Sequence, residues 1–147
     1  MSLFGNYSRE QLRLTYAQAW AKHVGRSPLT PLEASVADVI GLHPEYQRIV
    51  SDPDAALAFE PSAAGNAENP FLHMGLHLAV REQISIDRPP GIRDLQQQLQ
   101  ARYGGAHLAE HALMEALAEE LYRAQGAGEA PDEKRYLDRA RDRLTAR

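Results

Sequence analysis

The sequence predicts an all-α fold, a compact helical bundle of five to six main helices with short connections, in a single domain over residues 1–147. Three observations predict it. Apolar residues recur at the i, i+3, i+4, i+7 spacing of an amphipathic helix. Polar capping residues, several of them followed by proline, mark the helix starts. No segment of convincing length alternates apolar and polar residues as a strand does, and no internal repeat is present.

Composition narrows the class of protein. The chain has 147 residues, 44% hydrophobic and 24% charged, which suits one globular domain with a real core. The net charge of −4 argues against non-specific electrostatic binding of nucleic acid. No apolar run reaches the roughly 18 residues of a membrane span, and "MSLFGNYSREQLR" is unlike a signal peptide. The chain has no cysteine, which excludes disulfides and thiolate ligands, and a cytoplasmic location is expected.

The first helix is expected to open at a capping box formed by Ser8 and Gln11 and to end at residues 25–28. Its apolar stripe consists of Leu12, Tyr16, Ala19, Trp20 and His23. We expect His23 to be a boundary or core histidine and not a ligand. The second helix opens at Thr30, with proline and Glu33 in its first turn. Its stripe consists of Leu32, Val36, Val39, Ile40 and His43.

Pro44 ends the second helix, because a residue that precedes proline is disfavoured in the α region. A short helical piece should follow, with inward-facing residues Tyr46, Ile49 and Val50, and Asp52-Pro53 resembles another cap. Residues 59–68 show no period and are expected to form a loop. Asn69-Pro70 then starts a central helix that runs to about Ile86.

The "DRPPG" segment, residues 87–91, separates the central helix from a fifth helix that ends at Gly104. The fifth helix should bury Ile92, Leu95, Leu99 and Tyr103. The Gly104-Gly105 pair allows a tight reversal into a sixth helix, about residues 106–124. A last helix is expected to begin at Pro131, with Leu137, Ala140 and Leu144 on its inner face.

The central helix carries apolar residues around nearly its whole circumference, which is typical of a buried helix. His73 and His77 lie four residues apart on one of its faces. At that spacing two side chains are neighbours, with Cβ atoms about 5–6 Å apart. Two imidazoles so placed can reach one metal ion.

The sixth helix repeats the pattern with His107 and His111. Its predicted core stripe consists of Ala106, Leu113, Leu117, Leu121 and Ala124. On a helical wheel Glu110 falls in the middle of that stripe. A buried carboxylate is costly unless it is paired or ligates a metal.

These residues support a metal hypothesis: a divalent ion (zinc, iron or manganese) held by His73, His77, His107 and His111, with Glu110 and His43 as further ligands. The alternative is a non-catalytic protein-interaction module in which Glu110 bonds to His77 or Arg81 and the cluster is a structural polar network. "HLAEH" also matches the H-x-x-E-H pattern of inverted zinc peptidases. Those enzymes are much larger and need a distant third carboxylate ligand. The sequence assigns no reaction.

Two charged regions favour structural interpretations. Arg81-Glu82-Gln83, with Asp87, Arg88 and Arg93, forms a polar cluster that either docks a partner or an anionic ligand, or ties the helix end to the turn. The second interpretation is preferred, because charged groups near turns are usually solvated or locally paired. The tail "DEKRYLDRARDRLTAR" interleaves both signs, which is typical of a solvated helix face with i,i+4 pairs.

The strings "HPEY", "NPFLHMGLHLAVREQ", "DRPPGIR" and "HLAEHALMEALAE" resemble a family of small bacterial proteins described as domain of unknown function 1841. The similarity covers the chain from the first helix to about Leu137. The resemblance implies a compact, soluble bacterial domain and supplies no activity. It directs attention to residues His43, His73, His77, His107, Glu110 and His111.

Overall fold

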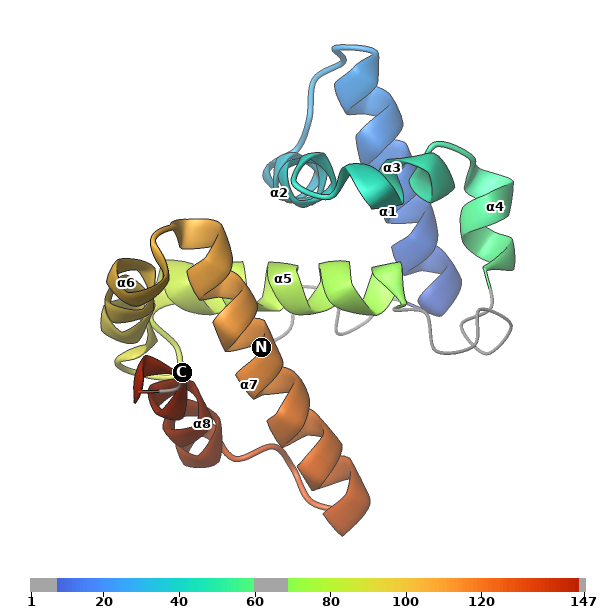
Figure 1. Ribbon diagram of the computed structural model, residues 1–147. Coiled ribbons are helices and arrows are strands. Elements are labelled where there is room, and N and C mark those ends of the chain that lie inside the picture. Colours follow the sequence, from blue (N-terminus) through green and yellow to red (C-terminus); the bar gives the residue numbers. More distant parts are fainter. Residues whose placement is uncertain (1–7, 60–68, 146–147) are drawn as a thin grey trace. The chain divides into compact units, whose positions relative to one another are not determined.

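The computed structural model describes residues 8–59 and 69–145, which form helices and turns and contain no strand (Figure 1). The all-α prediction is confirmed. The chain divides into two compact units, Met1–Leu78 and Ala79–Arg147. The helices of the described part are α1 (Arg9–Val24), α2 (Pro31–Gly41), α3 (Pro44–Val50), α4 (Pro53–Ala58), α5 (Pro70–Ile86), α6 (Ile92–Tyr103), α7 (Ala106–Ala127) and α8 (Glu133–Thr145).

The helix count in the described residues is eight, against the five to six main helices expected. The difference lies in the short helices α3 and α4, of 7 and 6 residues. At α4 the sequence showed only the cap, Asp52, whose side chain accepts a hydrogen bond from the Asp54 backbone N–H at 3.0 Å. All other predicted helices are present, and α7 is three residues longer than expected. The loop expected over residues 59–68 falls, apart from Phe59, outside the described residues.

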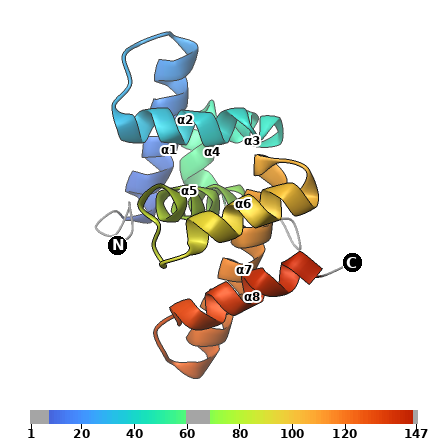
Figure 2. The ribbon, with the colours of Figure 1, turned by 90° about the vertical axis from the view of Figure 1, so that its left-hand side faces the viewer.

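In the first unit, the predicted capping box forms at Ser8, the predicted N-cap Thr30 forms a second one with Glu33, and α2 packs across α1 (Figure 2). The core of this unit consists of Tyr16, Ala19, Val36, Val39, Ile40, Val50, Met74 and Leu78. It therefore joins α1, α2 and α3 to the first half of α5, as the stripes predict. His23 lies at the boundary and not in the core, because its ring is exposed and stacks on Trp20 with centroids 5.1 Å apart.

Arg13 of α1 holds the end of α4 in the first unit. Its side chain is buried, and Nη1 donates to the carbonyl oxygens of Ala56, Leu57 and Phe59 at 3.1, 3.2 and 2.8 Å. The guanidinium carbon lies 4.7 Å from the centroid of the Phe71 ring. Arg13 thus satisfies carbonyl groups that the last turn of a helix leaves without a partner in the helix.

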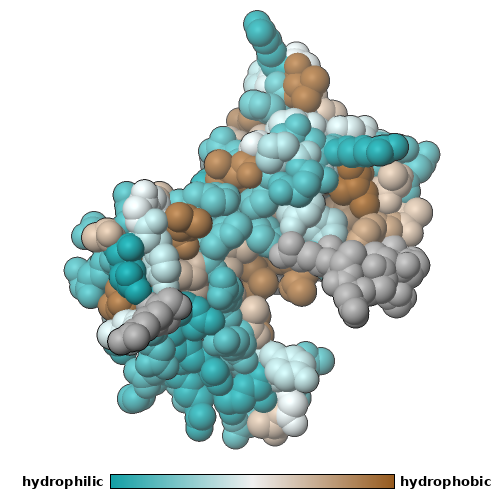
Figure 3. All heavy atoms as spheres, in the orientation of Figure 1, coloured by the Kyte–Doolittle hydropathy of each residue, from teal (hydrophilic) through white to brown (hydrophobic). Residues whose placement is uncertain are grey.

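The second unit contains α6, α7 and α8, each of which contacts the other two. Gly104 ends α6 in the left-handed conformation, with φ of 85°, so the reversal predicted at the Gly-Gly pair is confirmed. The α8 helix begins at Glu133, two residues after Pro131, and buries Tyr136, Leu137 and Ala140. Its charged residues pair along the helix, with Lys134 Nζ 2.8 Å from Asp138 Oδ2, and the surface over α8 is largely hydrophilic (Figure 3). The mixed-charge prediction is confirmed.

The buried face of α7 differs from the predicted stripe. Leu121 is 39% exposed and Ala106 is exposed, whereas Ala109, Ala116 and Glu120 are fully buried. Leu113, Leu117 and Ala124 are buried as predicted, so the true face overlaps the predicted stripe and extends beyond it on the side of Ala109, Ala116 and Glu120. The prediction was wrong at Ala106 and Leu121, because α7 carries alanines on several sides, and alanine does not distinguish a core face from a solvent face.

The fully buried acid of α7 is therefore Glu120, whereas Glu110, predicted in the middle of the core stripe, is only partly buried. The Glu120 carboxylate accepts hydrogen bonds from Arg123 Nη2 at 2.7 Å and from the Asp132 backbone N–H at 2.9 Å. Arg139 Nε of α8 lies 3.5 Å away. These partners compensate for burial of the charge.

The central helix α5 is not buried on all sides as predicted, because Leu72 is 59% and Ile86 55% exposed. At its C-terminal end, Arg93 donates from Nε to the Ile84 carbonyl and from Nη2 to the Ser85 carbonyl, at 3.1 and 2.9 Å. The Arg93 backbone N–H donates to Asp87 at 3.0 Å. The expected structural role of this polar cluster is confirmed. None of the described helices combines the length and the apolar character needed to cross a membrane.

Candidate metal centre

His43 lies at the junction between α2 and α3. Pro44 starts α3, and His43 takes the N-cap position with φ −127° and ψ 74°, outside the helical region. Its side chain is buried, and its Nδ1 atom lies 2.7 Å from the Val39 carbonyl oxygen. Because a carbonyl only accepts hydrogen bonds, Nδ1 carries a proton and donates it to Val39. In the neutral ring, Nε2 then holds the lone pair that a metal ion needs.

His73 and His77 of α5 meet His43 within the first unit. Their ring centroids lie 4.6 and 5.3 Å from that of His43, and 6.4 Å from each other. His77 is fully buried and His73 partly buried. His43 Nε2 and His73 Nε2 are 2.9 Å apart, so in the neutral pair His73 donates to His43. Three imidazoles from two segments of the chain thus converge on one point.

Burial is the main influence on the ionisation of His43. It lowers the pKa of this imidazole below its ordinary value, and the neighbouring His73 and His77 rings act in the same direction. The hydrogen bond to the Val39 carbonyl acts the opposite way. The neutral ring is therefore favoured, and the neutral form is the one that binds metals.

The spacing of the three imidazoles fits a metal ion. Each ring offers one nitrogen, and the three nitrogens lie within 4.8 Å of one another. Zinc binds imidazole nitrogens at about 2.0–2.1 Å, which places the ligand atoms of a tetrahedral site about 3.4 Å apart. The 2.9 Å contact between His43 Nε2 and His73 Nε2 is shorter than that spacing, so these two nitrogens have to move apart when an ion binds. A hydrogen bond from the second ring nitrogen to a backbone carbonyl, as at His43, is also what metal-binding histidines usually have.

The comparison with protein families gives one result. The family model described as domain of unknown function 1841 (DUF1841) matches residues 8–142. The chain belongs to this family. No curated protein and no solved structure matches it. Membership in DUF1841 confirms the resemblance seen in the sequence and brings no activity with it.

The remaining predicted site residues of this DUF1841 chain lie on α7, in the second unit. The His107 and His111 rings are neighbours, with centroids 4.2 Å apart and planes tilted by 44°. Glu110 accepts a hydrogen bond from Arg81 Nε at 3.1 Å, and its side chain is only 12% exposed. The ion pair with Arg81, which the structural alternative predicted, is confirmed. The carboxylate of the H-x-x-E-H pattern is therefore held by an arginine.

The sequence prediction missed the role of Tyr46. It was expected only to face inward, and it is partly buried. Its ring lies nearly parallel to that of His43, with centroids 5.3 Å apart and planes inclined by 14°. The edge of His73 also meets it, at 5.6 Å. The spacing of three residues in "HPEY" was the available signal, since residues i and i+3 share a helix face.

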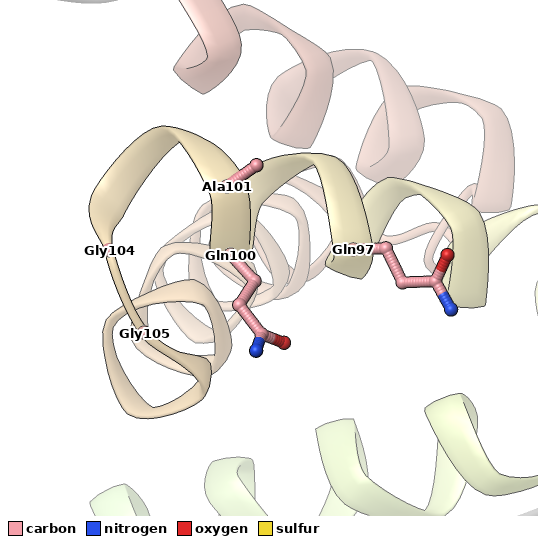
Figure 4. Close-up of a pocket in the computed structure, with 5 residues that line it drawn as sticks. All are labelled: Gln97, Gln100, Ala101, Gly104 and Gly105. Carbon is pink, nitrogen blue, oxygen red and sulfur yellow. The ribbon is translucent and has the colours of Figure 1, made fainter.

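The second unit also carries an open surface hollow of about 650 Å³. The side chains of Gln97 and Gln100 project from α6 beside it, and the Gly104-Gly105 turn completes its lining (Figure 4). No ionisable group lines this hollow. It offers no acid, base or nucleophile, and we assign it no catalytic role.

Proposed function

We propose that the protein binds a divalent transition-metal ion through His43, His73 and His77. The observation that carries the proposal is the convergence of three imidazoles whose ligand nitrogens lie within 4.8 Å of one another. Zinc is the first choice, because imidazole suits zinc, copper, nickel and iron, whereas manganese and magnesium prefer oxygen ligands.

The α7 residues His107, His111 and Glu110 are part of the proposal as additional ligands. Their inclusion rests on the spacing of the H-x-x-x-H pair and on the ability of a carboxylate to ligate iron or manganese. A cytoplasmic setting in a bacterial cell is also part of the proposal. Cell fractionation with an antibody against the chain tests the setting.

The proposal is tested by measuring metal content and metal-dependent stability. Untagged protein, purified without chelator, is analysed for bound metals. Chelator-treated protein is then titrated with Zn²⁺ by calorimetry. We expect about one equivalent of zinc per chain, and a rise in melting temperature on addition of Zn²⁺. Metal content near zero together with an unchanged melting temperature in Zn²⁺, Mn²⁺ and Fe²⁺ contradicts the proposal.

Matched variants locate the ligands. His43→Gln and His77→Gln are expected to abolish most zinc binding. His23→Gln is the control, because His23 is exposed on α1. The α7 ligands are tested in the same titration with His107→Gln, His111→Gln and Glu110→Gln. Unchanged zinc affinity in all three removes α7 from the site and leaves the His43, His73 and His77 centre standing.

The same contacts support a second candidate, a protein-interaction module in which the histidines form a structural network. The 2.9 Å hydrogen bond between His43 and His73 favours it, because that bond satisfies both nitrogens with no ion present. This candidate predicts a complex with a partner protein that survives chelator. A pull-down in chelating buffer, compared with one in Zn²⁺, separates the two candidates.

A further inference from the structure

The "HPEY" segment, His43 to Tyr46, begins with a proposed ligand and ends with an aromatic residue that the metal proposal does not use. Pro44 and Glu45 form the first turn of α3, and the Tyr46 backbone N–H donates to the His43 carbonyl at 2.9 Å. Because this bond closes the first turn of α3, the position of the Tyr46 ring is tied to the backbone of His43.

The Tyr46 ring contacts imidazoles from two separate segments of the chain. It stacks on His43, with centroids 5.3 Å apart, and receives the edge of His73 of α5 at 5.6 Å. His43 is thereby constrained on two sides, by the ring of Tyr46 and by the Val39 carbonyl at 2.7 Å. An imidazole whose rotation is restricted keeps its lone pair within a narrow range of directions, and this reduces the entropy lost when a ligand binds.

We propose that Tyr46 is a positioning residue of the metal centre, whose aromatic ring holds His43 and His73 in the orientation that binds the ion. The inference rests on the proposed function. The proposal assigns the effect to the aromatic ring, which makes the contacts with both imidazoles, and not to the hydroxyl. Phenylalanine is therefore a sufficient replacement, whereas an aliphatic residue is not.

The experiment uses the full chain as wild type and as Tyr46→Leu, Tyr46→Phe and Phe71→Leu. Phe71→Leu is the matched control, because it also removes a ring packed against the core of the first unit, one that stacks on Tyr16 with centroids 5.8 Å apart. Each protein is titrated with Zn²⁺ by calorimetry. Each is also loaded with Co²⁺, whose visible absorption bands report ligand geometry directly. Far-UV circular dichroism checks the fold of each variant.

We expect Tyr46→Leu to weaken zinc binding by roughly 10- to 100-fold, the usual effect of losing a residue that orients metal ligands. Its cobalt bands should shift or weaken. Tyr46→Phe should match wild type in affinity and spectrum. Phe71→Leu should lower the melting temperature and leave zinc affinity and cobalt bands unchanged. Should Tyr46→Leu fail to fold, Tyr46→Met, which fills more of the volume, takes its place.

Three results overturn the inference while leaving metal binding intact: wild-type affinity and spectrum in Tyr46→Leu, a loss in Tyr46→Phe equal to that in Tyr46→Leu, or an equal loss in Phe71→Leu. The second result would show that the phenol oxygen is the group that supports zinc binding. The third would show that loss of any ring packed in this core weakens zinc binding. Absence of zinc and cobalt binding in the wild type is a different failure, because it removes the proposed function itself.

Discussion

Replacing Arg13 with methionine tests how the first unit holds together around its histidines. Arg13 is 4% exposed, and its Nη1 group donates to three carbonyls at the end of α4, at 2.8 to 3.2 Å. Methionine has similar length and fills the space, so Arg13→Met removes the hydrogen bonds with little change in volume. The α4 helix has only 6 residues, so the hydrogen bonds at its C-terminal end are a large share of those that hold it.

The size of the stability loss expected in Arg13→Met follows from these contacts. A hydrogen bond to a charged group contributes about 1.5–3 kcal/mol, and a buried carbonyl left without a partner costs about 1–3 kcal/mol. The three acceptors share one nitrogen, which has two hydrogens, so their contributions do not add. We expect Arg13→Met to lower the free energy of unfolding by about 3–5 kcal/mol. For a chain of this size the melting temperature should fall by about 10 °C.

The assay exploits the single tryptophan of the chain, Trp20, which lies on α1 in the same unit. Urea unfolding followed by tryptophan fluorescence therefore reports the part of the molecule that contains Arg13. Hydrogen exchange at residues 56–59 should accelerate in the variant, since the end of α4 loses its cap. Arg48→Met is the control, because Arg48 is exposed on α3 and should change stability by less than about 0.5 kcal/mol.

A loss below about 1 kcal/mol in Arg13→Met, with unchanged exchange at the end of α4, would refute this reasoning, because it would mean that water replaces the arginine at no cost.

The remaining predictions concern the second unit. Tyr136→Phe removes the hydroxyl that donates to Gln83 Oε1 at 2.6 Å and should cost about 1 kcal/mol in urea unfolding followed by circular dichroism. Hydrogen bonds from Arg123 and from the Asp132 backbone N–H lower the pKa of Glu120 to about 2. The ionised carboxylate therefore stabilises the folded state fully above the unfolded pKa of about 4.3, and this contribution is lost as the pH falls toward 2. Glu120→Gln should therefore be less stable than wild type at pH 7, and its free energy of unfolding should fall less steeply between pH 5 and pH 3. If the two proteins lose stability equally over this pH range, Glu120 is not the stabilising carboxylate. Gly104→Ala should cost about 1 kcal/mol, because φ at Gly104 is 85°, and Gly105→Ala is a suitable comparison.

The helix boundaries could be predicted because the signals for them are local. The capping box at Ser8 and the N-cap at Thr30 each act over three residues, and both form as expected. Pro44 both ends α2 and begins α3, which leaves His43 at the junction. The candidate ligands His43, His73 and His77 could be named from the sequence for the same reason. Two of them share one face of a helix, and the third sits at a helix end fixed by proline.

The errors fall where the deciding partner is distant in the sequence. The fully buried acid is Glu120, and besides Arg123 of its own helix its partners are the Asp132 backbone N–H and Arg139 of α8, which lie beyond the segment. Arg13 is buried because carbonyls more than forty residues away accept its hydrogen bonds. A helical wheel built from one segment contains none of these distant partners. On α7, with its many alanines, the wheel also lacked the large side chains that would have fixed the inner face.

The two candidate functions predict similar behaviour of the metal-free protein, and this decides which measurement separates them. In both, His43 donates to Val39 and accepts from His73 when no ion is bound. Replacing a buried polar network with apolar side chains of similar size is often neutral or stabilising, so a stable His77→Leu variant is compatible with either. The two candidates differ only in how much the free energy of unfolding increases when metal is added. At a free Zn²⁺ concentration 100 times the dissociation constant, a bound ion adds about 2.7 kcal/mol to the folded state, whereas a purely structural network gains nothing. The stability of wild type and His77→Leu must therefore be compared with and without Zn²⁺. A metal site requires that Zn²⁺ stabilises the wild type and does not stabilise His77→Leu.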